Sequence, residues 1–304
     1  MDCKAAKSEV DRAICASPAA LAADSAMAAA YTALRERFSP AERESLLVSQ
    51  RAWIKRRGYG CDSDKPAYAQ CLTTQADQRR AFFEARPEGG PGVDSALRPE
   101  IVARPGRLRD WEIDVELLRF VEPKTPGERT FNAEVAKMLR DIPTDRKEIG
   151  RDQTFSHDVW MRLTWLSPRL ISARIEGYAF EGGAHGNPST AGLNIDTRSG
   201  RKLVFADAFD KAAQDKLTAA CLAQIVPEKV RRGMDEPKGE ELKTLRQGVE
   251  EGLSSLDTWN FTAKGATIVF GHYTLGSYAE GAYECEAPLA RLKELAKKDF
   301  PLPE

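Results

Sequence analysis

The sequence predicts an all-α module at the N-terminus, followed by an α+β domain. Three observations support this prediction. Ala fills 12 of the first 30 positions, and Ala is the strongest helix former. The segment Pro87–Gly92 holds two Pro and three Gly in six residues, a composition that interrupts helices and strands. Beyond it, apolar and charged residues alternate, which is typical of a half-buried strand.

Residues 1–86 are predicted to form four helices with clear start signals. Ser8, Ser17 and Ser39 are N-cap residues, and Pro follows the last two directly, at the first helical position. Ser39 and Glu42 have the spacing of a capping box. The apolar stripes at helical spacing are Val10 and Ile14; Leu21, Ala28, Tyr31, Leu34 and Phe38; Leu46, Leu47, Trp53 and Ile54; and Tyr68, Leu72, Phe82 and Phe83.

Residues 87–100 are predicted to be a Pro/Gly-rich linker, and the charge changes across it. Residues 1–86 carry 14 basic and 11 acidic side chains, a net charge of +3. The remainder carries 31 basic and 35 acidic side chains, a net charge of -4. The formal net charge of the whole chain is -1, which argues against a general nucleic-acid binder. No apolar run approaches the ~18 residues that a membrane span needs.

Residues 101–304 are predicted to form an antiparallel sheet with helices packed on it. Strands joined by hairpins, with the helices grouped together, are typical of the α+β class. The predicted strands lie around 111–117, 159–165, 170–180, 193–195, 261, 266–270 and 282–286, and the predicted helices around 131–139, 217–225, 242–256 and 288–298.

The cysteines favour a periplasmic or secreted protein. Their number is six, and none shows the C-x-x-C spacing of a metal site. Disulfides persist in oxidising compartments. The chain opens Met1-Asp2-Cys3-Lys4, without the charged and apolar regions of a secretory signal. We therefore expect that a signal was removed and that Met1 was added for expression.

The sequence contains none of the catalytic motifs G-x-S-x-G, H-E-x-x-H, G-x-x-x-x-G-K-[ST] or G-x-G-x-x-G. His157, His185 and His272 are scattered, so no zinc ligand set is visible. Paired cysteines would leave no thiol nucleophile. Paired carboxylates stay open, because no spacing rule selects a pair among 46 acidic residues. We expect a non-enzymatic protein without cofactor or metal.

Two loops framed by Gly are the candidate binding elements, at 181–188 and 271–281. Tyr offers a large contact area at a low entropic cost. The alternative for the first loop is a glycine-rich turn whose His bonds to the backbone, and for the second a wide hairpin whose Tyr rings pack on the sheet. If both loops lie at one edge of the sheet, they form a compact recognition patch. The candidate partner-binding residues are His185, Asn187, Tyr273, Tyr278 and Glu280.

A series of short motifs runs through the helical residues. They are Cys3, Val10-Asp11-Arg12-Ala13-Ile14-Cys15, Leu21-Ala22-Ala23-Asp24, Ala29-Ala30-Tyr31, Gln50-Arg51-Ala52-Trp53-Ile54-Lys55-Arg56-Arg57, Cys61 and Cys71-Leu72. With these motifs, residues 3–86 resemble the lysozyme-inhibitor LprI-like domain of bacterial envelope proteins. Asp11 departs from that pattern, which usually has Glu.

A second series follows the linker: Glu181-Gly182-Gly183-Ala184-His185-Gly186, Asn194-Ile195-Asp196, Ser199-Gly200-Arg201-Lys202-Leu203, Asp207-Ala208-Phe209, Phe261 and Tyr273 to Gly281. With it, residues 101–304 resemble the RsiV-like domain of unknown function. That domain occurs in the lysozyme-sensing anti-sigma factor RsiV and beside the catalytic domain of the deacetylase PdaC. This chain lacks the membrane segment of the first and the catalytic domain of the second, so we expect neither a membrane sensor nor a deacetylase. Both resemblances imply an envelope location.

The cysteines are predicted to pair as Cys3–Cys15 and Cys61–Cys71, each closing a short loop in the helical module. Cys221–Cys285 is then the remaining pair.

Three functions are considered. The first is a periplasmic binding protein that inhibits or binds lysozyme; the alternative is a module for peptidoglycan fragments or another envelope glycan, and the third is an undetected cell-wall hydrolase. Lysozymes are commonly basic, so an inhibitor is expected to offer acidic and aromatic groups. The acidic part of the chain, with Tyr278 and Glu280, fits that role better than the basic helices.

Overall fold

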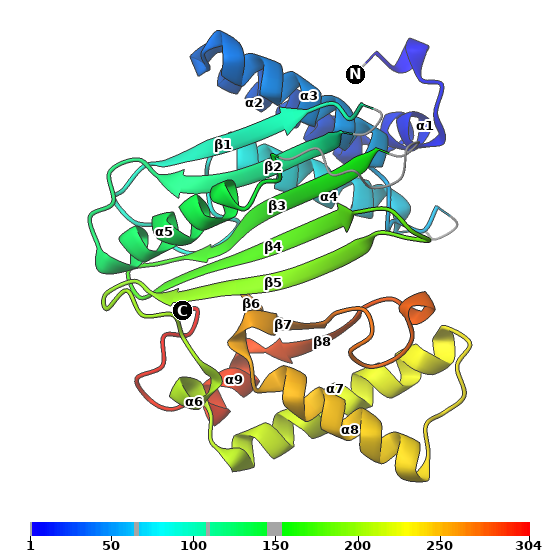
Figure 1. Cartoon of the computed structure of the whole chain (residues 1–304), viewed down its shortest axis with the longest axis vertical. Helices are drawn as coiled ribbons and strands as arrows, with labels where there is room; N and C mark the ends of the chain where they lie inside the picture. Colours follow the sequence, from blue (N-terminus) through cyan, green and yellow to red (C-terminus); the bar gives the residue numbers. More distant parts are fainter. Residues whose placement is uncertain (1, 64–66, 108–109, 145–153) are drawn as a thin grey trace.

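A five-stranded sheet forms the centre of the molecule, with α5 on one face and α2, α3 and α4 on the other (Figure 1). The computed structural model describes residues 2–63, 67–107, 110–144 and 154–304. The strands stand side by side in chain order: β1 (Leu97–Arg104), β2 (Trp111–Phe120), β3 (Phe155–Leu166), β4 (Leu170–Phe180) and β5 (Asn187–Asp196).

The N-terminal region is helical, as predicted. Ser8 accepts a hydrogen bond from the Asp11 amide, Ser17 accepts one from the Ala20 amide, and Ser39 forms a complete capping box with Glu42. These caps satisfy amides that lack a partner within the first helical turn. After a single 3₁₀ turn (Cys3–Ala5), the helices are α1 (Glu9–Ala16), α2 (Pro18–Arg37), α3 (Pro40–Arg56) and α4 (Tyr68–Phe83).

The C-terminal region has the α+β character that was predicted, but its main sheet is mixed rather than antiparallel. β2 and β3 run parallel, and α5 (Pro126–Arg140) forms the crossover between them. Parallel neighbours need such a crossover, whereas antiparallel ones can be joined by a tight turn. Alternation along one strand does not show in which direction its neighbour runs, so the sequence pattern did not reveal this pair.

The strand β1 begins at Leu97, inside the segment predicted to be a linker. Pro99 lies in this strand, opposite Leu118 of β2. Because β1 is at the edge of the sheet, Pro is tolerated there without breaking an internal ladder. Because the segment contains Pro and does not alternate strictly, the sequence pattern did not predict β1.

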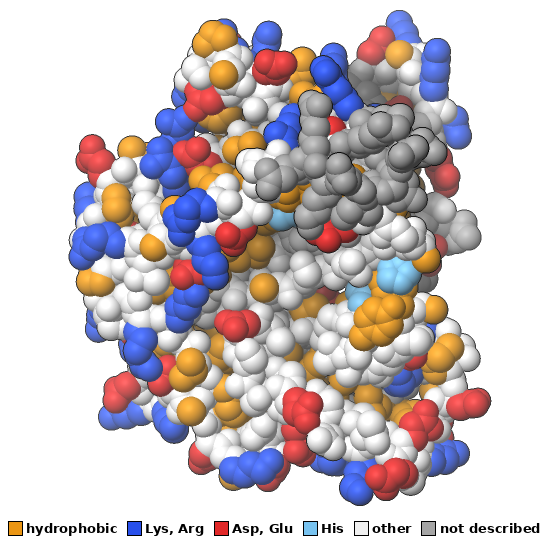
Figure 2. Space-filling model, in the orientation of Figure 1, with side chains coloured by type: hydrophobic (Ala, Val, Ile, Leu, Met, Phe, Trp, Pro, Cys, Tyr) orange, Lys and Arg blue, Asp and Glu red, His pale blue; other side chains and the backbone are white. Residues whose placement is uncertain are grey.

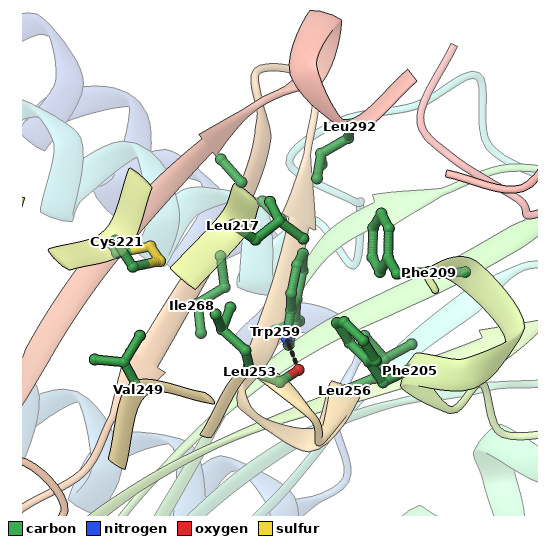
Figure 3. Close-up of a cluster of buried hydrophobic side chains, with 14 of the residues drawn as sticks. Phe205, Phe209, Leu217, Cys221, Val249, Leu253, Leu256, Trp259, Ile268 and Leu292 are labelled. Carbon is green, nitrogen blue, oxygen red and sulfur yellow. Dashed lines mark hydrogen bonds between the residues drawn. A yellow bond between two sulfur atoms is a disulfide. The ribbon is translucent and has the colours of Figure 1, made fainter. Parts of the chain in front are cut away.

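A smaller antiparallel sheet lies below the first in Figure 1, with helices against it. Its core is centred on Trp259, whose indole N–H donates to the Leu253 carbonyl at 3.1 Å and whose ring stacks on Phe209 (Figure 3). The strands are β6 (Trp259–Thr262), β7 (Gly265–Phe270) and β8 (Tyr283–Pro288), and the helices are α6 (Phe205–Ala208), α7 (Lys211–Arg231), α8 (Gly239–Leu253) and α9 (Leu289–Leu295), with 3₁₀ turns at Leu256–Thr258 and Tyr278–Glu280.

Three disulfides join the cysteine pairs that were predicted. Cys3–Cys15 and Cys61–Cys71 lie within the helical residues, and Cys221–Cys285 ties α7 to β8. The third bridge lies inside the core around Trp259, where both of its cysteines are buried. It therefore links the helical layer of that core to its sheet.

Helices α2, α3 and α4 share one hydrophobic core with the five-stranded sheet, while Ile14 of α1 packs in a small cluster with Ala20 and Leu72. Leu34, Leu46 and Phe83 are fully buried in the same cluster as Val115 and Leu117 of β2. The second cluster, around Trp259, is formed by residues from 203 onward together with Trp165 and Leu170 of the five-stranded sheet. The division into separate units at 87–100 stays a prediction.

Among the residues that the structure describes, no single helix is long and apolar enough to cross a membrane. The bent pair α1 and α2 passes that test only when the two helices are taken together, with an angle of 109° between them.

Candidate functional site

The two loops framed by Gly meet at one end of the molecule. The rings of His185, between β4 and β5, and Tyr278, between β7 and β8, stack with centroids 3.7 Å apart. The Tyr278 hydroxyl donates to the Gly186 carbonyl at 2.8 Å, and Nδ1 of His185 lies 3.0 Å from the same oxygen. Figure 2 shows pale blue histidine side chains against orange ones on the side where these loops lie. The loops are therefore held to each other by direct contacts.

Tyr278 is the centre of an aromatic patch, which we define as His185, His272, Tyr273 and Tyr278. The ring centroids of His272 and Tyr273 lie 4.9 and 5.6 Å from that of Tyr278. Tyr273 is 63% exposed and has a φ of +67°, a conformation that is uncommon for a residue other than Gly. The patch thus offers two exposed side chains, His185 and Tyr273, beside the partly buried His272 and Tyr278.

The backbone at Gly186 lies close against Tyr178 of β4. A Cβ at this position would lie 2.3 Å from the ring of Tyr178 on β4, which is closer than any side-chain atom can approach. A larger residue here would displace the end of the Tyr178 ring, so Gly keeps the present packing next to the carbonyl that receives the Tyr278 hydroxyl. The glycine of this loop therefore has a specific steric role.

Glu280 faces inward and holds the second loop in place. Its carboxylate pairs with Lys229 of α7 and accepts hydrogen bonds from the Ser277 amide at 2.7 Å and the Tyr283 hydroxyl at 2.9 Å. The hydrogen bond from Lys229 is the main cause that lowers the pKa of Glu280 to about 2. The side chains of Lys229 and Glu280 are only 9% and 11% exposed. Glu280 was predicted to contact a partner, whereas its geometry gives it a positioning role.

Lys229 and Arg232 were not singled out from the sequence. Lys229 also donates to the Leu275 carbonyl at 2.9 Å, and Arg232 donates to the carbonyls of Glu280 and Ala282. Lys229 continues the buried stripe that contains Ile225, four residues earlier on α7. A Lys at a core position of an amphipathic helix needs a buried partner, and that was the signal available in the sequence.

Asn187, the remaining candidate, is the exposed first residue of β5, opposite Ala179. It lies at the base of the first loop, and among the described residues no ring contact or hydrogen bond joins its side chain to the aromatic patch.

A second polar cluster fastens the N-terminal helices to the sheet. Arg79 of α4 pairs with Glu116 of β2 and donates to Gln50 and Ser49 of α3, each at 3.1 Å. Arg79 and Glu116 are both buried. Buried ions are tolerated when they are paired and fully hydrogen-bonded.

Close to this cluster, Asp114 of β2 accepts hydrogen bonds from Arg56 at 2.8 Å and from the Trp160 indole at 3.2 Å. Asp114 lies opposite Asp158 on the parallel strand β3. Burial and the charge of Asp114 raise the pKa of Asp158 to about 7. Within the described part of the chain, no group of three or more His, Cys, Asp or Glu is placed to hold a metal ion.

Two protein-family models match the chain. Residues 2–82 match the family described as lysozyme inhibitor LprI, and residues 204–290 match a family described as a protein of unknown function, DUF3298. The first match covers α1 to α4, which confirms the resemblance of the N-terminal residues. The second covers α6, α7, α8 and the three strands of the smaller sheet. The LprI match and the three disulfides are consistent with an extracytoplasmic protein.

Two solved structures of DUF3298-family proteins are similar to part of the chain. One is from Bacteroides fragilis and one from Pseudomonas aeruginosa; each has 18% identity and a TM-score of 0.44. They cover 68% and 69% of this chain and 93% and 99% of their own. No curated protein matches the chain at a significant level.

Proposed function

We propose that this protein is a periplasmic binding protein without catalytic activity and that its partner is a lysozyme. The observation that carries the proposal is the stacking of His185 on Tyr278, which joins two loops that are far apart in the sequence into one surface. The match of residues 2–82 to a lysozyme-inhibitor family supports the class of partner. The disulfides support an oxidising compartment.

The aromatic patch has the physical properties of a protein-binding surface. Tyr side chains are enriched among the residues that contribute most to binding. Lys229 and Glu280 fix the loop before a partner arrives, so little conformational entropy is lost on association. Residues 87–304 carry a net charge of -4, which favours the approach of a basic protein.

Calorimetric titration of the full chain against a panel of lysozymes tests the proposal. We expect binding by the wild type and a loss of at least ~2 kcal/mol of binding free energy for Tyr278→Ala. Val204→Ala is the matched control, because Val204 is an exposed apolar residue just before α6 and outside the patch. Absence of binding to every lysozyme would refute the proposed partner. Equal binding by wild type and Tyr278→Ala would refute the patch.

The second candidate function is the binding of peptidoglycan fragments. It is favoured by the exposed face of Tyr273 next to the polar edges of His185 and His272, because a sugar ring offers both apolar and hydrogen-bonding faces. Muropeptides in the same titration test it, and binding of muropeptides without binding of lysozyme would select this function.

A further inference from the structure

An open cavity lies between α7 and β8, in the part of the chain that matches the second family model. Its volume is about 590 Å³, which lies within the ~300–1,000 Å³ that is usual for ligand sites. Ala223, Pro227 and Arg231 of α7 lie on one side of it, and Ala282 and Glu284 at the start of β8 lie on the other. None of these residues belongs to the aromatic patch.

β8 stands at the end of the strand order in the small sheet, so one of its sides is an edge. The Leu289 amide donates to the Lys264 carbonyl. Because hydrogen-bonded and non-hydrogen-bonded pairs alternate along an antiparallel ladder, Cys285 also bonds to β7. The backbone groups of Glu284 and Glu286 therefore point away from β7, toward the open side of the strand.

Side chains of α7 cover this edge on both sides of Glu284. Gln224 accepts a hydrogen bond from the Glu286 amide at 2.8 Å and donates to the Glu286 carbonyl at 3.0 Å. Arg232 donates to the Ala282 carbonyl at 2.9 Å. Between them, the amide and the carbonyl of Glu284 have no hydrogen-bond partner in the part of the chain that the structure describes. The edge is thus left open at one residue, and that residue lines the cavity.

The contact of Gln224 with Glu286 shows which chemical group fits beside this edge. A Gln side chain ends in an amide, the group that also forms the peptide bond, and its two hydrogen bonds to Glu286 are those that a neighbouring strand makes. A strand rises about 3.4 Å per residue, so Glu284 offers the same donor and acceptor about 7 Å further along. An antiparallel peptide residue can exchange both hydrogen bonds with Glu284.

The two covered positions limit the length of such a peptide. Ala282 and Glu286 are four residues apart, which corresponds to about 14 Å of strand. An extended peptide of three residues is about 10 Å long and fits between the side chains of Arg232 and Gln224. A longer strand would run into one of these two side chains.

The face of the sheet toward α7 favours small side chains in the peptide. Cys285 points toward α7, where it bonds to Cys221, and Glu284 points to the other face. The residues on either side of the one that pairs with Glu284 would therefore face α7, where Ala223 and Pro227 line the cavity. Pro227 has no N–H, so the Ala223 carbonyl lacks the helical donor four residues later. This carbonyl adds an acceptor beside the cavity.

The charges at the cavity balance, so they select neither an anion nor a cation. The charged side chains of the lining and their ion-pair partners are three cations and three carboxylates. They are Arg231, Arg232 and Glu228 on α7, and Arg174, Glu176 and Glu284 on the strands. The pattern of backbone donors and acceptors therefore determines the ligand.

We propose that this cavity binds a short, uncharged, extended peptide of about three residues with small side chains, as an added strand on β8. The paired residue makes both of its backbone hydrogen bonds to Glu284. This site is separate from the aromatic patch, and it does not depend on the identity of the partner there.

NMR of the ¹⁵N-labelled full chain, titrated with acetyl-trialanine amide, tests the proposal. We expect a saturable shift of the Glu284 amide, with a dissociation constant on the order of 0.1–1 mM. The same peptide with an N-methyl group on its middle residue lacks the required donor. It should produce no saturable shift of this amide.

Ala223→Phe places a ring in the cavity and should weaken binding at least about 10-fold. Ala212→Phe is the matched control, because Ala212 is an exposed residue of the same helix outside the lining. The melting temperature of each variant shows whether it is folded, and the comparison of the two peptides on wild type needs no variant.

Three results would each overturn the proposal. The first is no saturable shift at Glu284 up to about 10 mM peptide, and the second is equal binding of the N-methylated peptide. The third is a shift at Glu284 that follows the protein concentration instead of the peptide concentration, which would identify a second copy of this chain as the occupant. Binding of the peptide by wild type and by Ala212→Phe, with weaker binding by a folded Ala223→Phe, supports the proposal.

Discussion

Asp114 and Asp158 lie opposite each other on the parallel strands β2 and β3. Asp114 accepts a hydrogen bond from Arg56 of α3 on one oxygen, while its other carboxylate oxygen is buried without a described hydrogen-bond partner. Burial raises the pKa of both carboxyl groups; the charge of Glu116 raises that of Asp114 further, and the charge of Asp114 raises that of Asp158 further. When two carboxyl groups share such a site, the repulsion between their charges favours the protonated form of one of them.

The stability of the fold is predicted to fall as the pH rises through 7. The groups that act on Asp158 are Asp114, Glu112 and Glu116 of β2, which raise its pKa, and Arg56 of α3, which lowers it. The pKa of Asp158 is about 7 in the folded state against an ordinary value of 3.8. The folded state therefore binds the Asp158 proton more tightly than the unfolded state does. The contribution of protonated Asp158 to stability is complete below pH 3.8 and is lost as the pH rises through about 7.

Asp158→Asn should remove this dependence. We expect the variant to melt at a higher temperature than wild type at pH 8 and near the wild-type temperature at pH 5, in thermal unfolding followed by circular dichroism. Asp215→Asn, at an exposed position on α7, is the control. A difference from wild type that is the same at both pH values would contradict the prediction.

Arg79→Ala is predicted to lower the free energy of unfolding by about 3–5 kcal/mol, because it leaves Glu116 buried without its counter-charge. Urea unfolding measures the change. Arg80→Ala is a close control with little expected effect, since Arg80 pairs with Glu84 near the surface. Similar losses for the two variants would show that the buried pair does not fasten the helices to the sheet.

Lys229→Met is predicted to release the loop that carries Tyr278. The pKa of Glu280 should rise from about 2 toward its ordinary value of 4.5, because its main hydrogen-bond donor is gone. In the wild type, a lowered carboxyl pKa contributes stability that is present above pH 4.5 and is lost as the pH falls through about 2. NMR titration of Glu280 checks the shift. An unchanged pKa in the variant would mean that Ser277 and Tyr283 hold the carboxylate alone.

Limited proteolysis tests the predicted linker. Glu88 donates its amide to the Leu163 carbonyl, and Gly89 and Gly92 are bonded to Leu166. Because this segment is hydrogen-bonded to β3 and the helices share the core of the sheet, we expect brief digestion not to separate residues 1–86 from residues 101–304. Release of two folded fragments that separate on a sizing column would instead favour independent units.

Several elements could be predicted from the sequence because their signals involve residues close together in the chain. Ser17 with Pro18 marks the start of α2, and the alternation of Trp111, Ile113 and Val115 marks β2. These signals involve neighbours along the chain, where capping and strand periodicity act. The two short disulfides and the Gly-framed loops were visible for the same reason.

The candidate site was only partly predictable. The loops with His185 and Tyr278 were identified by their composition, but the ring stacking depends on how β5 and β8 are placed in space. Glu280 was identified and its partner was not, because Lys229 lies 51 residues away on α7. No local pattern specifies such a pairing.

The sequence by itself determined the helical start signals, most of the strands, the cysteine pairs and the families that the two ends resemble. Only the tertiary structure decided that β2 and β3 are parallel, that Arg79 meets Glu116, and that His185 stacks on Tyr278. The physical reason is that caps, turns and hydrophobic periodicity act over a few residues. Core packing and buried charge pairing instead select among all residues that the fold brings together.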